Sequence, residues 1–145
     1  MHNFKTMNKQ IYTLLSFTWG LPLSLIGSLV ALVLLTLGYK PIPHGYGYCF
    51  KIGESWGGLN LGYFSFICKD APERTPKHEF GHGLQNCYYG IFTPFIVTIP
   101  SAIRYWYYML KYAQGTPVTT PYDAIWFESQ ATEWGYKEIE KISKL

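Results

Sequence analysis

The chain has 145 residues, a formal net charge of +3, 14% charged residues and 19% aromatic residues. This length suits one domain with accessory segments, and the absence of basic runs interleaved with aromatic residues excludes nucleic acid as an expected partner. Soluble domains carry roughly 25% charged residues, so the low charge and the abundant Tyr and Trp favour a protein at a membrane interface.

The first predicted element is an apolar segment near the N-terminus. No charged residue occurs between Lys9 and Lys40. About 20 apolar residues cross a bilayer as a helix, and Trp19 and Tyr39 flank the segment as interfacial anchors do. We therefore predict a single-pass transmembrane anchor at residues 19–39 and localisation in a membrane.

The domain organisation follows from this anchor. Residues 1–18 form an N-terminal segment, residues 40–47 form a linker punctuated by Pro and Gly, and residues 48–145 form one further domain. A cleaved signal peptide is the alternative to an anchor, but the segment is long and no A-x-A-like cleavage site follows it. Lysines on both sides of the segment leave its orientation open.

The beginning of the domain has the composition of β-structure. Two runs rich in aromatic and β-branched residues, 48–52 and 59–69, flank the turn-rich stretch GESWGG. This arrangement predicts a β-hairpin. Cys49 and Cys68 could pair across it in an oxidising compartment, and buried free thiols are the other interpretation.

A helix with a clear start signal follows. Thr75 is suited to be its N-cap and Pro76 its first residue, and the helix is expected to end at Tyr89, before Gly90. It contains the string H-E-F-G-H at residues 78–82.

The two histidines of this string predict a metal site. His78 and His82 are four residues apart, so they share one face of a helix, and Zn²⁺ accepts neutral imidazole nitrogen as a ligand. Glu79 projects about 100° away around the helix, where it can accept a proton from the attacking water as general base. Two solvated histidines that share a face by chance are the alternative.

The remaining chain predicts more helices. A second uncharged stretch, residues 83–103, contains Pro94 and Pro100, which favours an interfacial, re-entrant or buried core segment over a simple spanning helix. Helices are expected at residues 101–113 and from Thr120, as N-cap, to Ile142. The predicted fold class is α+β, with an N-terminal transmembrane helix, a β-hairpin and about three further helices.

The HExxH string resembles the active-site signature of the zincin metallopeptidases. The branch with HExxHxxGxxH does not fit, because Gln85 and Tyr88 stand where glycine and a third histidine are needed. The gluzincin branch takes its third ligand from a glutamate on a later helix. Glu128 begins the string E-x-x-A, which ends at Ala131 and is similar to that ligand motif. The resemblance implies a minimal zincin-like domain with His78, His82 and Glu128 on the metal.

Other glutamates compete for the role of third ligand. Glu138 lies near the charged C-terminal tail, and Glu133 is five residues beyond Glu128, so it points elsewhere when Glu128 faces the metal. Gluzincins often carry an acid one residue after the small residue, to orient a zinc-bound histidine. Thr132 stands at that position, which implies weaker metal binding or turnover, or another group in its place.

The resemblance also implies a strand edge that pairs with an extended substrate. The residues expected there, unless this strand only covers the core, are Gly58, Leu59, Asn60 and Leu61. A zincin further needs a hydrogen-bond donor for the oxyanion. The candidates are Tyr122, Tyr105 and Arg104.

These features predict a membrane-anchored, zinc-dependent metalloendopeptidase. Its expected partners are a protein or peptide substrate and a lipid membrane. The alternative is a zincin-fold membrane protein that binds metal or a protein partner without turnover, since a fold does not guarantee an activity. A membrane accessory protein with a chance motif is a third interpretation.

Overall fold

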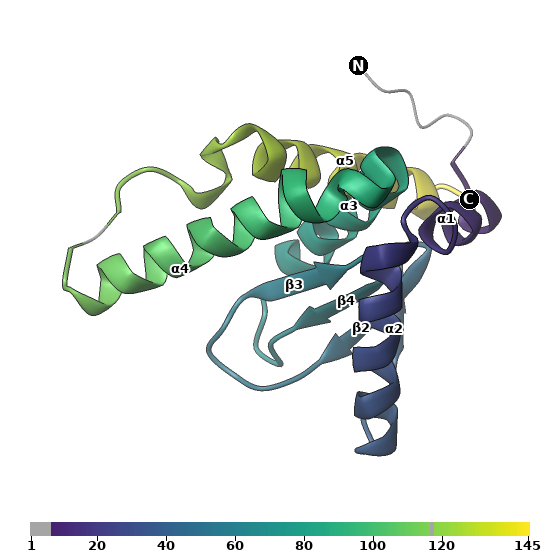
Figure 1. Cartoon of the computed structure of the whole chain (residues 1–145), viewed down its shortest axis with the longest axis horizontal. Helices are drawn as coiled ribbons and strands as arrows, with labels where there is room; N and C mark the ends of the chain where they lie inside the picture. Colours follow the sequence, from purple (N-terminus) through teal and green to yellow (C-terminus); the bar gives the residue numbers. More distant parts are fainter. Residues whose placement is uncertain (1–6, 117) are drawn as a thin grey trace.

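The computed structural model describes residues 7–116 and 118–145. Within these residues the fold is α+β, which confirms the predicted class (Figure 1). The helices are α1 (Lys9–Ser16), α2 (Leu21–Thr36), α3 (Arg74–Tyr89), α4 (Ile99–Ala113) and α5 (Trp126–Ser143). Short helical turns join them: η2 (Gly90–Phe92), η3 (Pro94–Thr98) and η4 (Tyr122–Ala124).

The strands form one mixed sheet in the order β1-β2-β4-β3. They are β1 (Ile42–His44), β2 (Gly47–Lys51), β3 (Gly58–Leu61) and β4 (Phe64–Ile67). β1 is antiparallel to β2, β3 is antiparallel to β4, and β2 lies parallel to β4. β3 is therefore an edge strand.

The predicted hairpin between residues 48–52 and 59–69 is wrong. The hairpin is formed by β3 and β4, and β2 pairs with β4 in parallel. Gly62, at φ 72°, turns the chain inside the run LNLGYFSF. Because a single glycine makes this turn, the sequence suggests one continuous apolar strand where the structure has two. The predicted linker at residues 40–47 also contains β1 and a turn at Gly45, so it belongs to the sheet.

The starts of two helices, α3 and α5, differ from the predictions. α3 ends at Tyr89 as expected, but it begins at Arg74. The predicted start of the last helix at Thr120 is wrong, because Pro121 is extended, with ψ 143°, and α5 begins only at Trp126. Hydrogen bonds from Arg104 and Tyr108 of α4 fix the carbonyl groups of residues 120–122, and the Pro121 carbonyl also accepts the Ala124 N–H at the short turn η4.

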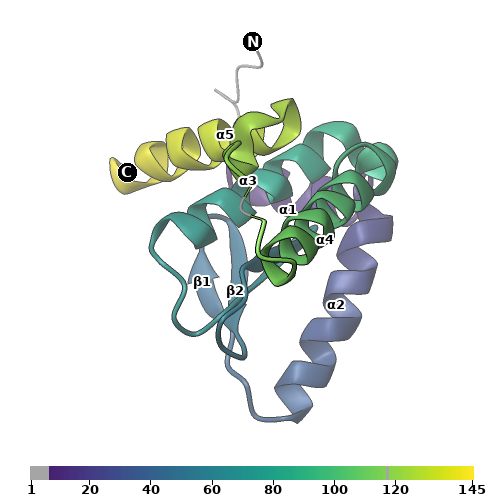
Figure 2. The same ribbon diagram turned by 90° about the vertical axis from the view of Figure 1, so that its left-hand side faces the viewer.

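Helices cover both faces of the sheet. Side chains alternate between the two faces of a strand, and Phe50 and Phe66 pack with Ala31 of α2 on one face. Gly58 lies against Glu79 of α3 on the other face. α5 crosses α3 on the side away from the strands (Figure 2). α3 is thus enclosed between the sheet and α5.

Residues 19–39, predicted as a membrane anchor, contain α2, a helix of 16 residues. In the described part of the chain no helix by itself has both the length and the apolar character needed to cross a bilayer; α1 and α2 meet these criteria only as a pair, with a bend of 96° between them. On the side of α2 away from the sheet, large apolar side chains are exposed: Leu25, Ile26, Leu29, Leu32 and Val33.

The second uncharged stretch, residues 83–103, forms the end of α3, the turns η2 and η3, and the start of α4. The buried-core interpretation does not fit its second half, because Phe95 is 70% exposed and Ile103 is 65% exposed. The ring of Phe92 lies 6.0 Å from that of Trp19, just before α2. The exposed apolar residues of this stretch therefore adjoin those of α2.

Candidate metal centre

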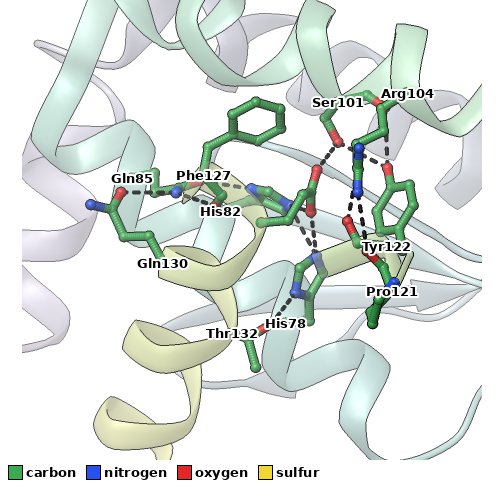
Figure 3. Close-up of polar contacts among 11 residues, drawn as sticks. His78, His82, Gln85, Ser101, Arg104, Pro121, Tyr122, Phe127, Gln130 and Thr132 are labelled. Carbon is green, nitrogen blue, oxygen red and sulfur yellow. Dashed lines mark hydrogen bonds and ion pairs between the residues drawn. The ribbon is translucent and has the colours of Figure 1, made fainter. Parts of the chain in front are cut away.

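Three predicted ligands meet between α3 and α5. His78 Nε2 lies 2.9 Å from Glu128 Oε2, His82 Nε2 lies 3.2 Å from the same oxygen, and the two Nε2 atoms are 3.2 Å apart. Glu128 is fully buried in the first turn of α5. Figure 3 shows the two imidazoles directed into this cluster.

The triangle of Nε2, Nε2 and Oε2 has the dimensions of one face of a zinc tetrahedron. With ligand bonds of 2.0–2.1 Å, adjacent vertices of such a tetrahedron are about 3.3 Å apart. The observed separations of 2.9–3.2 Å differ from this by a few tenths of an ångström. Two imidazoles and one carboxylate are also a common catalytic zinc set, in which the fourth position belongs to water. The residues therefore fit a zinc ion.

Each of the three ligands has a separate hydrogen-bond partner for its outer atom. His78 Nδ1 lies 2.9 Å from the Thr132 hydroxyl, and His82 Nδ1 lies 2.7 Å from Gln85 Oε1. Ser101 donates its hydroxyl proton to Glu128 Oε1. Such partners fix the orientation of metal ligands and raise their affinity. Thr132 and Gln85 are neutral, so the outer nitrogen of each histidine is oriented by an uncharged group.

The amide of Gln85 defines the tautomer of His82. Its nitrogen donates to the carbonyl oxygen of Phe127 at 2.8 Å and to Gln130 Oε1 at 3.0 Å (Figure 3). The amide oxygen must therefore face His82 Nδ1, and because that oxygen only accepts, Nδ1 carries a proton. In the neutral ring Nε2 then keeps its lone pair for a metal.

The charges of the cluster favour a cation. Hydrogen bonds from His78 and His82 outweigh burial and hold the pKa of the Glu128 carboxyl well below its usual range. Burial by itself would lower the pKa of His82, but the neighbouring Glu128 and Glu79 carboxylates raise it to about 9. Without a metal the ring is therefore protonated at neutral pH, and a bound cation would replace the proton on Nε2. An ionised carboxylate is thus present at neutral pH in a largely water-excluded site, where electrostatic attraction is strong.

Glu79 lies beside the cluster, as its helical position predicts. Its side chain is buried against β3, where a Cβ added at Gly58 would be 2.7 Å from Glu79 Oε1. Burial raises the pKa of the Glu79 carboxyl above its ordinary value. A raised pKa brings a carboxylate closer to the neutral range in which a general base is most effective.

The four candidate substrate-binding residues make up β3, and they differ in environment. Leu59 is exposed, Asn60 is buried with its side chain bonded to the 62–65 turn, and Leu61 packs on the α2 side. The backbone N–H of Cys68 donates to the Gly57 carbonyl, so Gly57 and Cys68 form a hydrogen-bonded pair between the two strands. Since bonded and non-bonded pairs alternate, Gly58 and Asn60 direct their backbone N–H and C=O groups to the free edge.

The three oxyanion candidates also differ. Tyr122 lies nearest to the cluster, because its hydroxyl is 3.3 Å from Ser101 Oγ, and Ser101 contacts Glu128. Burial raises the pKa of Tyr122 to about 12, so it remains a donor at neutral pH. The Arg104 guanidinium donates to the carbonyls of Pro121 and Tyr122 (Figure 3). Tyr105 lies near Gly57.

The competing glutamates lie outside the cluster. Glu133 is bound to Lys137 on the exposed face of α5. Glu138 is buried, where it accepts hydrogen bonds from Tyr46 at 2.6 Å and from Lys141 at 2.7 Å. Both therefore have structural partners of their own.

Sequence reasoning missed Gln85 and Ser101. Gln85 follows His82 by three residues, so helical spacing alone places it on the same face. Ser101 has no such signal, because it reaches Glu128 from another helix across 27 positions of sequence.

In comparisons with known proteins, no family model, no curated protein and no solved structure matches this chain.

Proposed function

We propose that this chain is a membrane-associated zinc metalloendopeptidase with a minimal, gluzincin-like zincin domain. The observation that carries the proposal is the convergence of His78, His82 and Glu128 on one point, each with its outer atom separately bound. Structural histidines need only satisfied hydrogen bonds. A set in which three inner atoms face one another and three outer atoms are oriented is typical of a metal centre.

The proposed mechanism assigns a role to each nearby group. Zinc bound to the three ligands supplies Lewis acidity and lowers the pKa of the attacking water. Glu79 accepts a proton from that water and passes it to the leaving amine. The backbone of β3 at Gly58 and Asn60 pairs with an extended peptide. The Tyr122 hydroxyl is the favoured oxyanion donor, a role in which its proton turns from the Ser101 carbonyl to the substrate.

The membrane is part of the proposal because two exposed apolar surfaces adjoin. One is the outer face of α2, and the other is formed by η2, η3 and the outer face of α4. Soluble monomers rarely expose contiguous apolar patches larger than a few hundred Å². The tyrosines and tryptophans of α4, such as Trp106 and Tyr107, are suited to the headgroup layer.

A zinc-binding protein without turnover is the second candidate, and one observation favours it. Both ligand histidines are oriented by neutral groups, Thr132 and Gln85, which raise ligand basicity less than a carboxylate does. Glu79→Gln separates the two functions. If the protein is a peptidase, this variant retains zinc and loses hydrolysis of an unstructured protein by at least about 100-fold. If wild-type protein holds zinc and cleaves nothing, the second candidate is correct.

A further inference from the structure

The carboxylate of Glu128 is held at both oxygens by different helices. Oε2 faces the two histidines of α3, whereas Oε1 accepts the hydroxyl proton of Ser101 from α4. Tyr122 donates to the Ser101 carbonyl at 3.1 Å, which uses its only proton. A carboxylate can only accept, so the proton between Ser101 and Glu128 belongs to Ser101.

We propose that Ser101 is a positioning residue that makes Glu128 a one-oxygen metal ligand. This inference rests on the proposed function, in which the cluster binds zinc. The terminal torsion of a glutamate is broad, so a carboxylate without a second partner can rotate and offer one or both oxygens to a metal. The hydroxyl of Ser101 occupies Oε1 and leaves only Oε2 for the cation, which preserves a four-coordinate centre.

The placement of Ser101 does not depend on the contact between α3 and α5. Ser101, Arg104 and Tyr108 follow one face of α4 at helical spacing. Arg104 and Tyr108 donate to the carbonyls of residues 120–122, where η4 begins at Tyr122 ahead of α5. α4 thus holds both the segment that leads into α5 and the ligand in its first turn. The metal centre is built from three helices, not two.

The test compares zinc and cobalt(II) binding by the full chain and by Ser101→Ala, with Ser129→Ala as control. Ser129 is exposed and adjacent to Glu128. Ser101→Ala should bind zinc about 10- to 100-fold more weakly, and Ser129→Ala should bind it as wild type does. With cobalt(II), loss of the Ser101 contact should lower the visible absorption, because two-oxygen binding by Glu128 raises the coordination number above four.

The outcomes separate this inference from the proposed function. If Ser101→Ala binds zinc with an unchanged Kd, the proposed role of Ser101 is overturned. It is also overturned if the affinity for zinc falls but the cobalt(II) spectrum stays the same. Wild-type protein that binds neither metal overturns the proposed function itself. If Ser101→Ala does not fold, Ser101→Gly takes its place with the same expectations, because glycine also removes the hydroxyl and adds no group that binds a metal.

Discussion

Gly81 of α3 and Ala131 of α5 are in backbone contact. A Cβ added at Gly81 would overlap the carbonyl oxygen of Ala131, and one added at Gly135 would overlap that of Lys77. The two helices therefore touch at these positions without intervening side chains. This close approach brings Glu128 within hydrogen-bond distance of both histidines.

Gly81→Ala tests this contact. The added methyl group must separate α3 from α5, so we expect a loss of stability of about 1–3 kcal/mol, although alanine by itself favours a helix by about 1 kcal/mol. Zinc affinity should fall as well. Gly57→Ala is the control, because its Cβ would meet only Tyr105 at 3.8 Å. Thermal unfolding and zinc titration check both effects; equal stability of the two variants contradicts the contact.

The third ligand can be tested by metal stoichiometry. Glu128→Ala should purify with much less zinc than wild type, since two histidines alone hold zinc weakly. Glu133→Ala, on the exposed face of the same helix, should retain it. Elemental analysis after equal dialysis measures the metal, and circular dichroism confirms the fold. Equal zinc in both variants would exclude Glu128 as a ligand.

The contact between Thr132 and His78 can be tested with an isosteric substitution. Thr132→Val keeps the shape of the side chain and removes the hydroxyl that lies 2.9 Å from His78 Nδ1. Outer partners of metal ligands typically contribute 10- to 100-fold to affinity or activity, and a neutral hydroxyl should be near the lower end, about tenfold. Competition with a chromophoric chelator measures the zinc Kd. No change would show that Thr132 does not orient the histidine.

The cysteines predict a pattern of chemical reactivity. Cys49, Cys68 and Cys87 are buried free thiols in the structure, and burial raises the pKa of Cys49 to about 11. At pH 8 only about one Cys49 in a thousand is then a thiolate, the form that reacts. Iodoacetamide should therefore modify the folded protein slowly and all three thiols after denaturation. If Cys49 and Cys68 form a disulfide instead, mass spectrometry of the denatured, unreduced protein will find both residues without the iodoacetamide modification.

The apolar surface predicts binding to lipid. Ile103 on α4 is 65% exposed, so Ile103→Glu introduces a charge without disturbing the core. If this surface enters a bilayer, the variant should bind phosphatidylcholine vesicles more weakly, because a buried charge is costly there. Leu145→Glu, at the exposed end of the chain, should leave binding unchanged. Vesicle flotation measures both; equal binding argues against contact of α4 with lipid.

Local features of the sequence predicted more of this molecule than did its long-range pairings. The end of α3 and the shared face of His78 and His82 follow from capping and helical spacing within a few residues. The parallel pairing of β2 with β4 does not, because the turn at Gly62 lies inside an apolar run. Ser101 has no local signal either, since its role depends on how α4 packs against α5.

The candidate metal centre has an order of assembly built into the chain. His82 precedes Glu128 by 46 positions, and α4 lies between them. During translation the histidine pair is complete well before the acidic residue has been synthesised, and the hydroxyl from α4 is available before the carboxylate that it binds. On the proposed function, firm capture of the cation is therefore one of the last events of biogenesis, and hydrolytic activity appears only when α5 has docked.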